Sequence, residues 1–328
     1  MITSTLFTAP ELEAATRIVR AAMPPTPQYV WPLLCDVIGT EVWVKHENHT
    51  PTGAFKVRGG LVLLTAIRES PQAPAGLVSA TTGNHGQSLA FAARQVGLPV
   101  ALVVPEGNST EKNAAMRGYG AELIVTGRDF DEARGYAAAL AADRGWRSVP
   151  PFHPDLVRGV ATYAKELFDA AGELDAGYVP IGMGSGICGL LTVRELLGLR
   201  TEVIGVVADG APAYALSVEA GHPVRTEHAA TFVDGVACRD PDPAAVELIS
   251  AGAARVLRVP DSDVADAMRL LYRTTHNVAE PAGAIALAAL RAESDRQRGR
   301  RVAVVMTGGN VDTANLRLVL SGGFPSAA

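Results

Sequence analysis

Short apolar segments alternate with alanine-rich segments along most of this 328-residue chain. The first apolar segments, which we predict to be strands, occupy residues 76–80, 99–105 and 121–125. Helices are predicted between them, at residues 88–96 and 110–118. Strands that are apolar throughout and separated by helices are typical of parallel sheets covered on both faces. This alternation predicts an α/β fold.

A second series of the same kind follows in the C-terminal half. Its predicted strands occupy residues 177–181, 202–207 and 301–306, with a helix near residues 190–197. The proline-rich residues 146–154 lie between the two series and are a candidate boundary. Glycine-rich loops follow three of the predicted strands. In open α/β sheets ligands bind at the carboxyl ends of the strands, so we expect a site there.

Composition and charge argue against several classes of protein. With 48% hydrophobic residues the chain can bury a large core. Its net charge of -5, without a run of lysine and arginine, argues against a nucleic-acid partner. No apolar stretch approaches the roughly 18 residues of a membrane span, and residues 1–20 lack a signal-peptide pattern. Cys35, Cys188 and Cys238 fit neither a disulfide framework nor a CxxC metal site. We expect a reduced, cytoplasmic protein.

One lysine stands in an unusual context, the segment Asn48-His49-Thr50-Pro51-Thr52-Gly53-Ala54-Phe55-Lys56-Val57-Arg58-Gly59-Gly60. A lysine is ordinarily solvated and structural. Here small residues flank Lys56 and would let backbone and cofactor approach each other closely. A partly buried lysine has a lowered pKa and can form an imine with an aldehyde. Lys56 is therefore our candidate for covalent catalysis.

The loop Thr82-Gly83-Asn84-His85-Gly86-Gln87 follows one predicted strand and leads into a helix. Backbone N–H groups at a helix N-terminus form an anion site that suits a substrate carboxylate. The amide of Asn84 can donate to a phenolate oxygen. The structural alternative is a helix cap with Asn84 in a left-handed turn. His85 by itself is more often a capping or core histidine than a base.

The loop from Gly182 to Gly189 allows two interpretations. Gly184-Ser185-Gly186-Ile187-Cys188-Gly189 matches the GxGxxG pattern, and Asp209 lies twenty residues after Gly189 at the end of a strand. That is formally what a dinucleotide site needs. The same N–H groups would hold any phosphate, and Ser185 adds a hydroxyl donor. The loop alone therefore leaves an NAD-dependent dehydrogenase open.

Other candidate residues are ambiguous when taken singly. Thr307-Gly308-Gly309-Asn310 follows the last predicted strand and reads by itself as a strand-to-loop turn. Glu280 precedes an alanine-rich helix and is either a helix cap or a buried carboxylate near the site. His46 and His49 form an HxxH pattern in a context that does not support a metal, so we expect none there.

Together and in this order, these segments resemble the fold-type II pyridoxal-phosphate enzymes, which share a tryptophan synthase β-like fold. The closest group is the serine/threonine dehydratase and serine racemase family. The resemblance extends from Thr26 to about Asp312 and is most specific at Lys56 and at the Gly-Asn-His-Gly-Gln loop. It implies two parallel-sheet α/β domains with the cofactor between them. The small domain would be residues 46–146, and the large one residues 1–45 plus 147–328.

The resemblance also implies a role for each motif residue. Lys56 would be the Schiff-base lysine of pyridoxal 5'-phosphate, with Phe55 beside the ring. Asn84 would hydrogen-bond the ring oxygen, and Thr307 would face the pyridine nitrogen. The phosphate would be held by Gly182, Met183, Gly184, Ser185 and Gly186. The substrate carboxylate would be bound by Thr81, Thr82, Gly83 and His85. Thr82 takes the place of a serine that serves racemases as the acid–base group opposite the lysine.

The chain departs from the family pattern in several places. Ala54 replaces the usual serine before Phe-Lys, and Met183 and Ser185 interrupt a phosphate loop that is usually nearly all glycine. The family's divalent-cation site needs carboxylates after residues 202–207, where only Asp209 is acidic, so we expect that site to be absent. Because the chain ends soon after Asn310, we also expect no C-terminal regulatory domain.

These implications predict β-elimination of a β-hydroxy amino acid such as threonine, serine or phenylserine, giving a 2-keto acid and ammonia. With only the neutral hydroxyl of Thr307 beside its nitrogen, the cofactor ring would withdraw electrons modestly. This is enough for the substrate to lose a β-hydroxyl. An amino-acid racemase is the alternative within the class. We expect an amino-acid substrate, a homodimer or higher homo-oligomer, and neither nucleic acid nor membrane as partner. The sequence leaves the preferred substrate and its configuration open.

Overall fold

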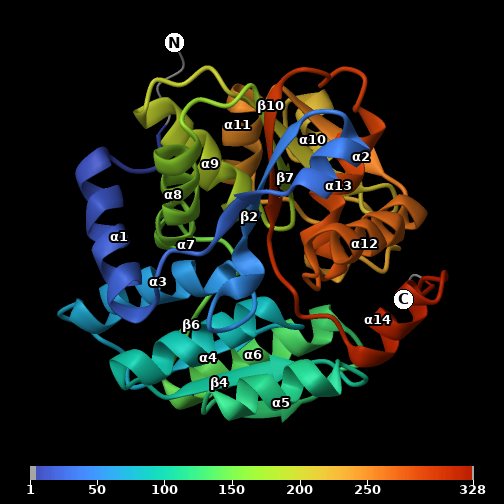
Figure 1. Ribbon diagram of the computed structural model, residues 1–328. Coiled ribbons are helices and arrows are strands. Elements are labelled where there is room, and N and C mark those ends of the chain that lie inside the picture. Colours follow the sequence, from blue (N-terminus) through green and yellow to red (C-terminus); the bar gives the residue numbers. More distant parts are fainter. Residues whose placement is uncertain (1–4, 327–328) are drawn as a thin grey trace.

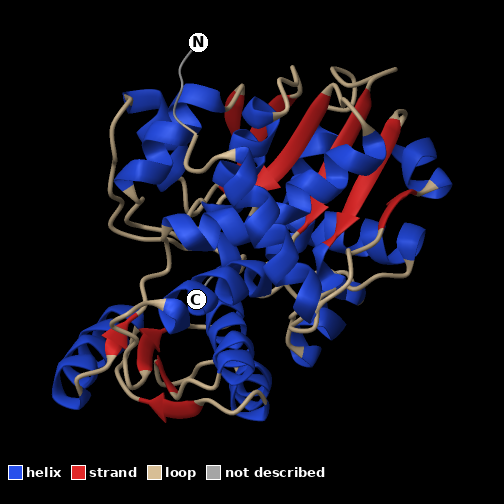
Figure 2. Cartoon of the chain, turned by 90° about the vertical axis from the view of Figure 1, so that its left-hand side faces the viewer, coloured by secondary structure: helices blue, strands red, loops and turns tan. Residues whose placement is uncertain are grey.

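The computed structural model describes residues 5–326, whose strands form two separate sheets (Figures 1 and 2). The larger sheet has the order β1-β2-β10-β7-β8-β9. Its strands are β1 (Gln28–Val30), β2 (Glu41–His46), β7 (Ala176–Pro180), β8 (Glu202–Ala208), β9 (Arg255–Val259) and β10 (Arg301–Met306). The smaller sheet has the order β5-β4-β3-β6. Its strands are β3 (Leu77–Ala80), β4 (Val100–Val104), β5 (Glu122–Val125) and β6 (Arg147–Ser148).

Helices connect the strands and cover both sheets. The helices up to β6 are α1 (Ala9–Ala22), α2 (Pro32–Ile38), α3 (Lys56–Glu69), α4 (Asn84–Val96), α5 (Thr110–Gly118) and α6 (Phe130–Arg144). Those after it are α7 (Pro154–Val160), α8 (Thr162–Ala171), α9 (Ser185–Leu196), α10 (Ala213–Ala220), α11 (Pro243–Gly252), α12 (Asp261–Thr275), α13 (Pro281–Ala292) and α14 (Thr313–Leu320). The short 3-10 helices are η1 (Glu47–His49) and η2 (Asp234–Val236).

The larger sheet is buried on both faces because successive side chains of a strand point to opposite sides. In β10, Val302 and Val304 pack with α12 and α13, whereas Ala303 and Val305 pack with α8, α9 and α11. In the smaller sheet, Leu102 of β4 faces the core of α3 and α4. The predicted α/β fold with parallel sheets is confirmed.

Three details differ from the expectations. The edge strand β1 is antiparallel to β2, whereas the other paired strands are parallel. The expected domain boundary after residue 146 precedes β6, which pairs with β3, so the smaller sheet extends to Ser148. Extended backbone before a proline-rich turn can still join a ladder, as the bond from Arg147 N to Gly76 O shows. Finally, α4 and α9 begin at Asn84 and Ser185, several residues earlier than predicted.

The site residues lie where the two lobes meet. Thr307 follows β10 and Gly182 follows β7, both at the carboxyl end of the larger sheet, while Thr81 follows β3 of the smaller one. The helix α3 packs against α4 and α7 and runs along this junction. Figure 1 shows β10 descending from the upper lobe into the loop that leads to α14 beside the lower lobe.

Candidate active site

Lys56 is the first residue of α3, and its Nζ lies 3.3 Å from Oγ of Ser185, the first residue of α9. Nζ also lies 4.9 Å from the centroid of the Phe55 ring. Burial lowers the pKa of Lys56 to about 8, and the nearby Glu280 carboxylate opposes this shift. A larger share of this amine is therefore neutral near pH 7 than for a solvated lysine.

A buried ionic network supports the start of α3. The guanidinium of Arg58 donates to Glu47 Oε2 at 2.7 Å and to Glu166 Oε1 at 2.8 Å. Lys45 Nζ donates to Glu166 Oε2 at 2.6 Å. Since all four side chains are buried, two cations balance two carboxylates away from water. In the sequence Arg58 stood out only as a neighbour of Lys56, and this network was not predicted.

The side chain of Asn84 is held from both ends. Its Nδ2 donates to Glu280 Oε1 at 2.8 Å and to Oε2 at 3.0 Å. Its Oδ1 accepts from Asn310 Nδ2 at 2.8 Å, and Asn310 Nδ2 also donates to the Thr52 carbonyl at 2.7 Å. The amide of Asn84 thus has one orientation, with its N–H₂ group toward Glu280.

Glu280 is a buried carboxylate; it occupies the N-cap position of α13, but its side chain makes no capping hydrogen bond there. Burial raises its pKa to about 7, the Lys112 ammonium acts in the opposite direction, and Asp234 raises it further. The carboxylate packs closely on the turn after β10, because a β-carbon on Gly308 would lie 2.4 Å from Glu280 Oε1.

The loop before α9 has the features of a phosphate site. Gly184 has φ +93°, which favours glycine, and a β-carbon on Gly182 would lie 2.4 Å from the Gly235 carbonyl. The Tyr214 hydroxyl donates to the Met183 carbonyl at 3.0 Å. The first N–H groups of α9 have no partner within the helix and can bind an anion. Met183 Sδ lies 3.7 Å from Cys238 Sγ.

Thr307 is buried and joined to the Lys56 segment. Its carbonyl accepts from Phe55 N at 2.9 Å. Its Oγ1 donates to the Ala282 carbonyl at 3.1 Å, which leaves the oxygen lone pairs as acceptors. The position therefore offers a neutral hydroxyl and not a carboxylate.

The residues expected to bind a carboxylate differ from one another in environment. Thr81 Oγ1 accepts from the N–H groups of Gly86 at 2.9 Å and Gly83 at 3.2 Å, so this buried hydroxyl shapes the loop. Thr82 is exposed. Burial and the Lys56 charge lower the pKa of His85 to about 3, so its ring is neutral at pH 7. Its buried Nε2 has no hydrogen-bond partner among the described residues.

Lys112 is a site residue that no sequence motif revealed. It lies in the first turn of α5, and a β-carbon on Gly83 would lie 2.9 Å from its Cδ. Its Nζ forms an ion pair with Asp234 of η2, in the other lobe. A lysine at the start of a polar helix resembles any solvated lysine in sequence, so no local signal could have identified it.

This set of side chains fits an aromatic aldehyde that carries a phosphate. Lys56 offers an amine of lowered pKa, the start of α9 offers anion-binding N–H groups, and Asn84 and Thr307 offer neutral polar groups. His85 Nε2 is a buried polar atom left for a further partner. Residues 19–308 match the model of the family described as pyridoxal-phosphate dependent enzymes.

The chain belongs to this family. It is 34% identical over 281 residues to the biosynthetic L-threonine dehydratase of Salmonella typhimurium, covering 85% of this chain and 54% of that protein. It is 33% identical over 298 residues to the L-threo-3-hydroxyaspartate ammonia-lyase of a Pseudomonas species, covering 90% and 93%. The crystal structure of the T.th. threonine deaminase superposes with a TM-score of 0.86 at 31% identity, covering 93% and 99%.

The chain spans about half the length of several curated relatives, such as the Salmonella dehydratase, of which it covers 54%. Membership of a pyridoxal-phosphate dependent family does not support the dehydrogenase alternative. Asp209, which that alternative required, is exposed after β8.

Residues 5–326 contain neither a metal cluster nor a membrane-spanning helix. No three His, Cys, Asp or Glu side chains in this part of the chain are grouped to hold a metal ion. His46 Nε2 accepts a hydrogen bond from Trp31 Nε1, and His49 Nε2 is hydrogen-bonded to Asn277 Oδ1. None of the helices described is long and apolar enough to cross a bilayer.

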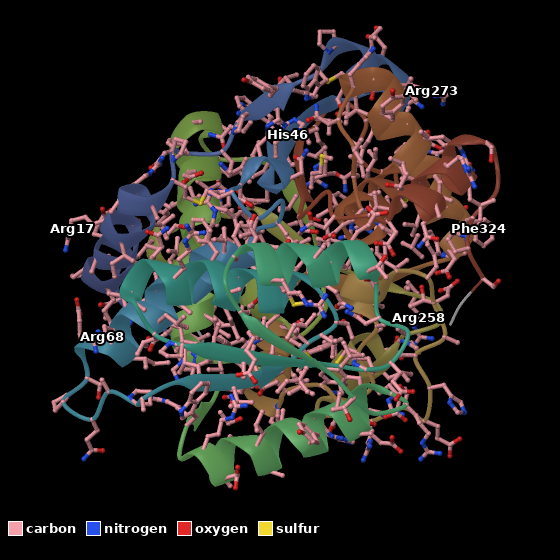
Figure 3. The ribbon with its side chains drawn as sticks, turned by 90° about the horizontal axis from the view of Figure 1, so that it is seen from below. Arg17, His46, Arg68, Arg258, Arg273 and Phe324 are labelled. Atoms are coloured by element: carbon pink, nitrogen blue, oxygen red, sulfur yellow. The ribbon has the colours of Figure 1, made fainter. Side chains whose placement is uncertain are left out.

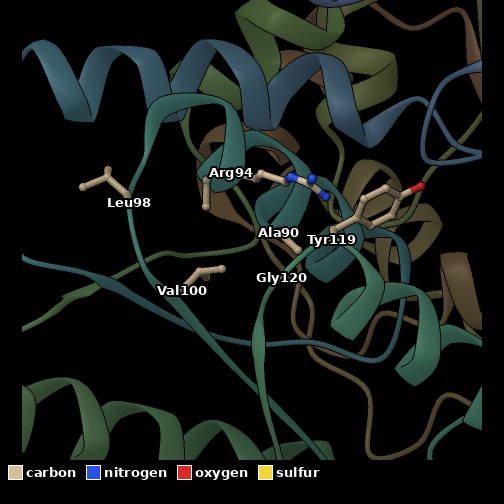
Figure 4. A pocket seen from close by; sticks show the side chains of 7 residues that line it. Ala90, Arg94, Leu98, Val100, Tyr119 and Gly120 are labelled. Atoms are coloured by element: carbon tan, nitrogen blue, oxygen red, sulfur yellow. The ribbon is translucent and has the colours of Figure 1, made fainter.

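Arg17, Arg68 and Arg258 are exposed, and Figure 3 shows Arg17 and Arg68 on the side of the molecule opposite Arg258. A hollow on α4, lined by Arg94, Leu98 and Tyr119 among others, is shown in Figure 4. None of the candidate site residues lines it.

Proposed function

We propose that this pyridoxal-phosphate dependent enzyme catalyses β-elimination of a β-hydroxy amino acid, giving a 2-keto acid and ammonia. The observation that carries the proposal is the position of Lys56, with Nζ 3.3 Å from Ser185 Oγ at the anion-binding start of α9. A primary amine of lowered pKa beside a phosphate site is the arrangement that this chemistry requires. The dehydratase and ammonia-lyase names of the relatives support the same reaction class.

Each residue has a task that follows from its chemistry. When bound, pyridoxal phosphate supplies an electrophilic aldehyde and an electron-accepting ring. Lys56 would hold the cofactor and then accept the substrate α-proton at Nζ. In the loop of residues 81–85, the N–H groups of Thr82, Asn84 and His85 would bind the substrate carboxylate, because those of Thr81 and Gly83 already donate to the Val103 carbonyl and to Thr81 Oγ1. Residues 182–186 would bind the phosphate, and Asn84 would turn its N–H₂ group from Glu280 to donate to the ring oxygen.

Thr307 would favour elimination over reactions that need a long-lived carbanion. A neutral hydroxyl beside the pyridine nitrogen supplies no charge to stabilise a long-lived carbanion. A substrate that has lost its α-proton would therefore expel its β-hydroxyl promptly. Loss of water, followed by addition of water and release of ammonia, yields the 2-keto acid.

Racemisation is the second candidate, and Thr82 is the observation that favours it. Its hydroxyl is exposed in the carboxylate loop and could protonate the face opposite Lys56. To decide, a single enantiomer of serine or threonine is incubated with the enzyme, and keto acid and chiral composition are followed together. We expect keto acid as the main product, and Thr82→Ala should retain its formation. Rapid inversion with little keto acid, lost selectively in Thr82→Ala, would identify a racemase.

We further infer two domains with the cofactor between them, working in the cytoplasm as a homodimer or higher homo-oligomer. Tyr29, Leu33 and Val37 are apolar side chains exposed together on β1 and α2, which supports association. The cysteines of the described chain are free, as in a reducing compartment. Light scattering of the purified protein tests the oligomeric state, and a monomer at micromolar concentration would contradict it.

A further inference from the structure

Lys112 brings a positive charge to the carboxylate loop from a neighbouring helix. Its side chain is 11% exposed, and its Cδ would lie 2.9 Å from a β-carbon on Gly83. Gly83 is the N-cap residue of α4, within the segment that we expect to bind the substrate carboxylate. The loop N–H groups and the Lys112 ammonium therefore act on the same small volume.

Asp234 holds this ammonium from the opposite lobe. It begins η2, and the carbonyl of the next residue, Gly235, lies 2.4 Å from where a Gly182 β-carbon would be. Asp234 is thus next to the expected phosphate loop. The Lys112–Asp234 ion pair spans the junction between the two sheets, next to both expected anion sites.

The charged groups around this ion pair can balance one substrate carboxylate but not two. Lys112 is balanced by Asp234, and Glu280 is a further carboxylate close to both of them. Lys56 is expected to bind the cofactor. Arg239, from the same segment as Asp234, is paired with Asp131 and donates to the Glu227 carbonyl at 3.2 Å. His85 is neutral. A second carboxylate on the substrate would meet Asp234 and Glu280 without a free cation among the described residues around it.

We propose that Lys112 and Asp234 determine substrate specificity: Lys112 helps to bind the α-carboxylate, and Asp234 disfavours a substrate with a second carboxylate at the β-carbon. The preferred class is then a β-hydroxy amino acid with an uncharged side chain, and not hydroxyaspartate. This inference rests on the proposed β-elimination.

Asp234→Asn tests the second half of the proposal. The ratio of kcat/KM for L-threo-3-hydroxyaspartate to kcat/KM for L-threonine should rise roughly tenfold, because one repulsive charge is removed while the side-chain shape is kept. Asp169→Asn is the matched control. Asp169 is paired with Lys165 on the exposed side of α8, and its loss should leave the ratio unchanged. An unchanged ratio in Asp234→Asn, or a native enzyme that prefers hydroxyaspartate, would overturn the specificity claim.

Lys112→Met tests the first half with a binding measurement. L-alanine has the carboxylate but no leaving group, and isopropylamine carries a methyl group where L-alanine has its carboxylate. The visible spectrum of the holoenzyme reports the binding of each. In Lys112→Met the affinity for L-alanine should fall at least about tenfold, whereas that for isopropylamine should stay nearly constant. KM for threonine should rise more than kcat falls, because the contact acts on bound substrate and transition state alike.

The two proposals fail in different ways. Equal losses of affinity for L-alanine and isopropylamine in Lys112→Met would mean that Lys112 supports only the structure of the site. If the native enzyme converts no β-hydroxy amino acid, the proposed elimination is wrong. The comparison of L-alanine with isopropylamine would still decide whether Lys112 binds a carboxylate.

Discussion

Two ionisable residues at the site are both shifted by burial toward their neutral forms. The pKa of Lys56 is lowered to about 8 and that of Glu280 is raised to about 7. Desolvation penalises the charged form of each group, and the Glu280 carboxylate offsets part of this penalty for Lys56. The neutral fraction of the Lys56 amine near pH 7 is therefore larger than that of a solvated lysine, which favours its use as a base.

Lys56→Ala should abolish turnover by several orders of magnitude while the protein stays folded. The substitution removes the amine that would bind the cofactor and move the proton, and it removes a charge that burial disfavours. Turnover, the visible absorbance of bound cofactor and the thermal unfolding midpoint are compared with those of Lys165→Ala, a lysine on the outer side of α8. Normal activity in a folded Lys56→Ala protein would contradict the pyridoxal assignment of this lysine.

Glu280→Gln should remove a pH dependence of stability in the apoenzyme. The folded-state pKa of Glu280 is about 7, above the ordinary value, so between about pH 4.5 and 7 the folded state binds the proton more strongly than the unfolded state. The free energy of unfolding should thus fall as pH rises through this window, by about 3 kcal/mol in total from this group. Urea unfolding at several pH values measures the slope. Equal slopes in the two proteins would show that Glu280 ionises normally.

At the scale of elements, close packing of backbone on backbone shapes the loop that we expect to bind the phosphate. The loop between β7 and α9 passes so near Gly235 of η2 that a β-carbon on Gly182 would collide with its carbonyl. The Tyr214 and Tyr163 hydroxyls donate to the carbonyls of Met183 and Gly186 at 3.0 and 2.9 Å. The loop is thereby held with its N–H groups free for an anion.

Gly182→Ala should weaken pyridoxal phosphate binding at least about tenfold, since relief of this collision must displace a backbone segment. Gly135→Ala in α6 is the control, because nothing lies within 4 Å of its added carbon. A glycine-to-alanine change inside a helix should add about 0.5–1 kcal/mol of stability. Titration of each apoenzyme with the cofactor gives the affinities. An unchanged affinity in Gly182→Ala would mean that the loop does not bind the phosphate.

For the whole molecule, the site is assembled across both lobes. The smaller-sheet lobe supplies Asn84 and Lys112, whereas Ser185, Asp234 and Thr307 come from the larger-sheet lobe. Several contacts cross the junction, among them those from Asn84 to Glu280 and from Lys112 to Asp234. A cofactor bound there would contact both lobes and stabilise their association.

Removal of the cofactor should therefore lower the thermal unfolding midpoint. A ligand at one hundred times its Kd adds about 2.7 kcal/mol of stability, which for a chain of this size corresponds to about 4 °C. Differential scanning calorimetry compares the holoenzyme, the apoenzyme and the apoenzyme with added pyridoxal phosphate. Pyridoxal without its phosphate should restore less of the midpoint. Full restoration by pyridoxal would contradict a phosphate site at residues 182–186.

The sequence alone determined the features that depend on local pattern. Runs of apolar residues identified β3, β4, β5, β7, β8 and β10 but not β1, β2, β6 or β9, and their alternation with helices predicted parallel pairing. The Lys56 segment and the glycine-rich loops pointed to the cofactor class, since each motif is contiguous. The same local reading placed the starts of α4 and α9 too late, because glycine before a helix looks like loop until its hydrogen bonds are known.

The tertiary structure decided everything that rests on partners far apart in the chain. Arg58 meets Glu166, Asn84 meets Glu280, and Lys112 meets Asp234 across more than a hundred residues in each case. No local pattern encodes such pairs, because they form only when separate strands and helices pack. Burial then decides the outcome for each charge: it lowers the pKa of Lys56 and raises that of Glu280. The sequence supplied the chemical groups, and the packing of the two lobes decided their charge states and their partners.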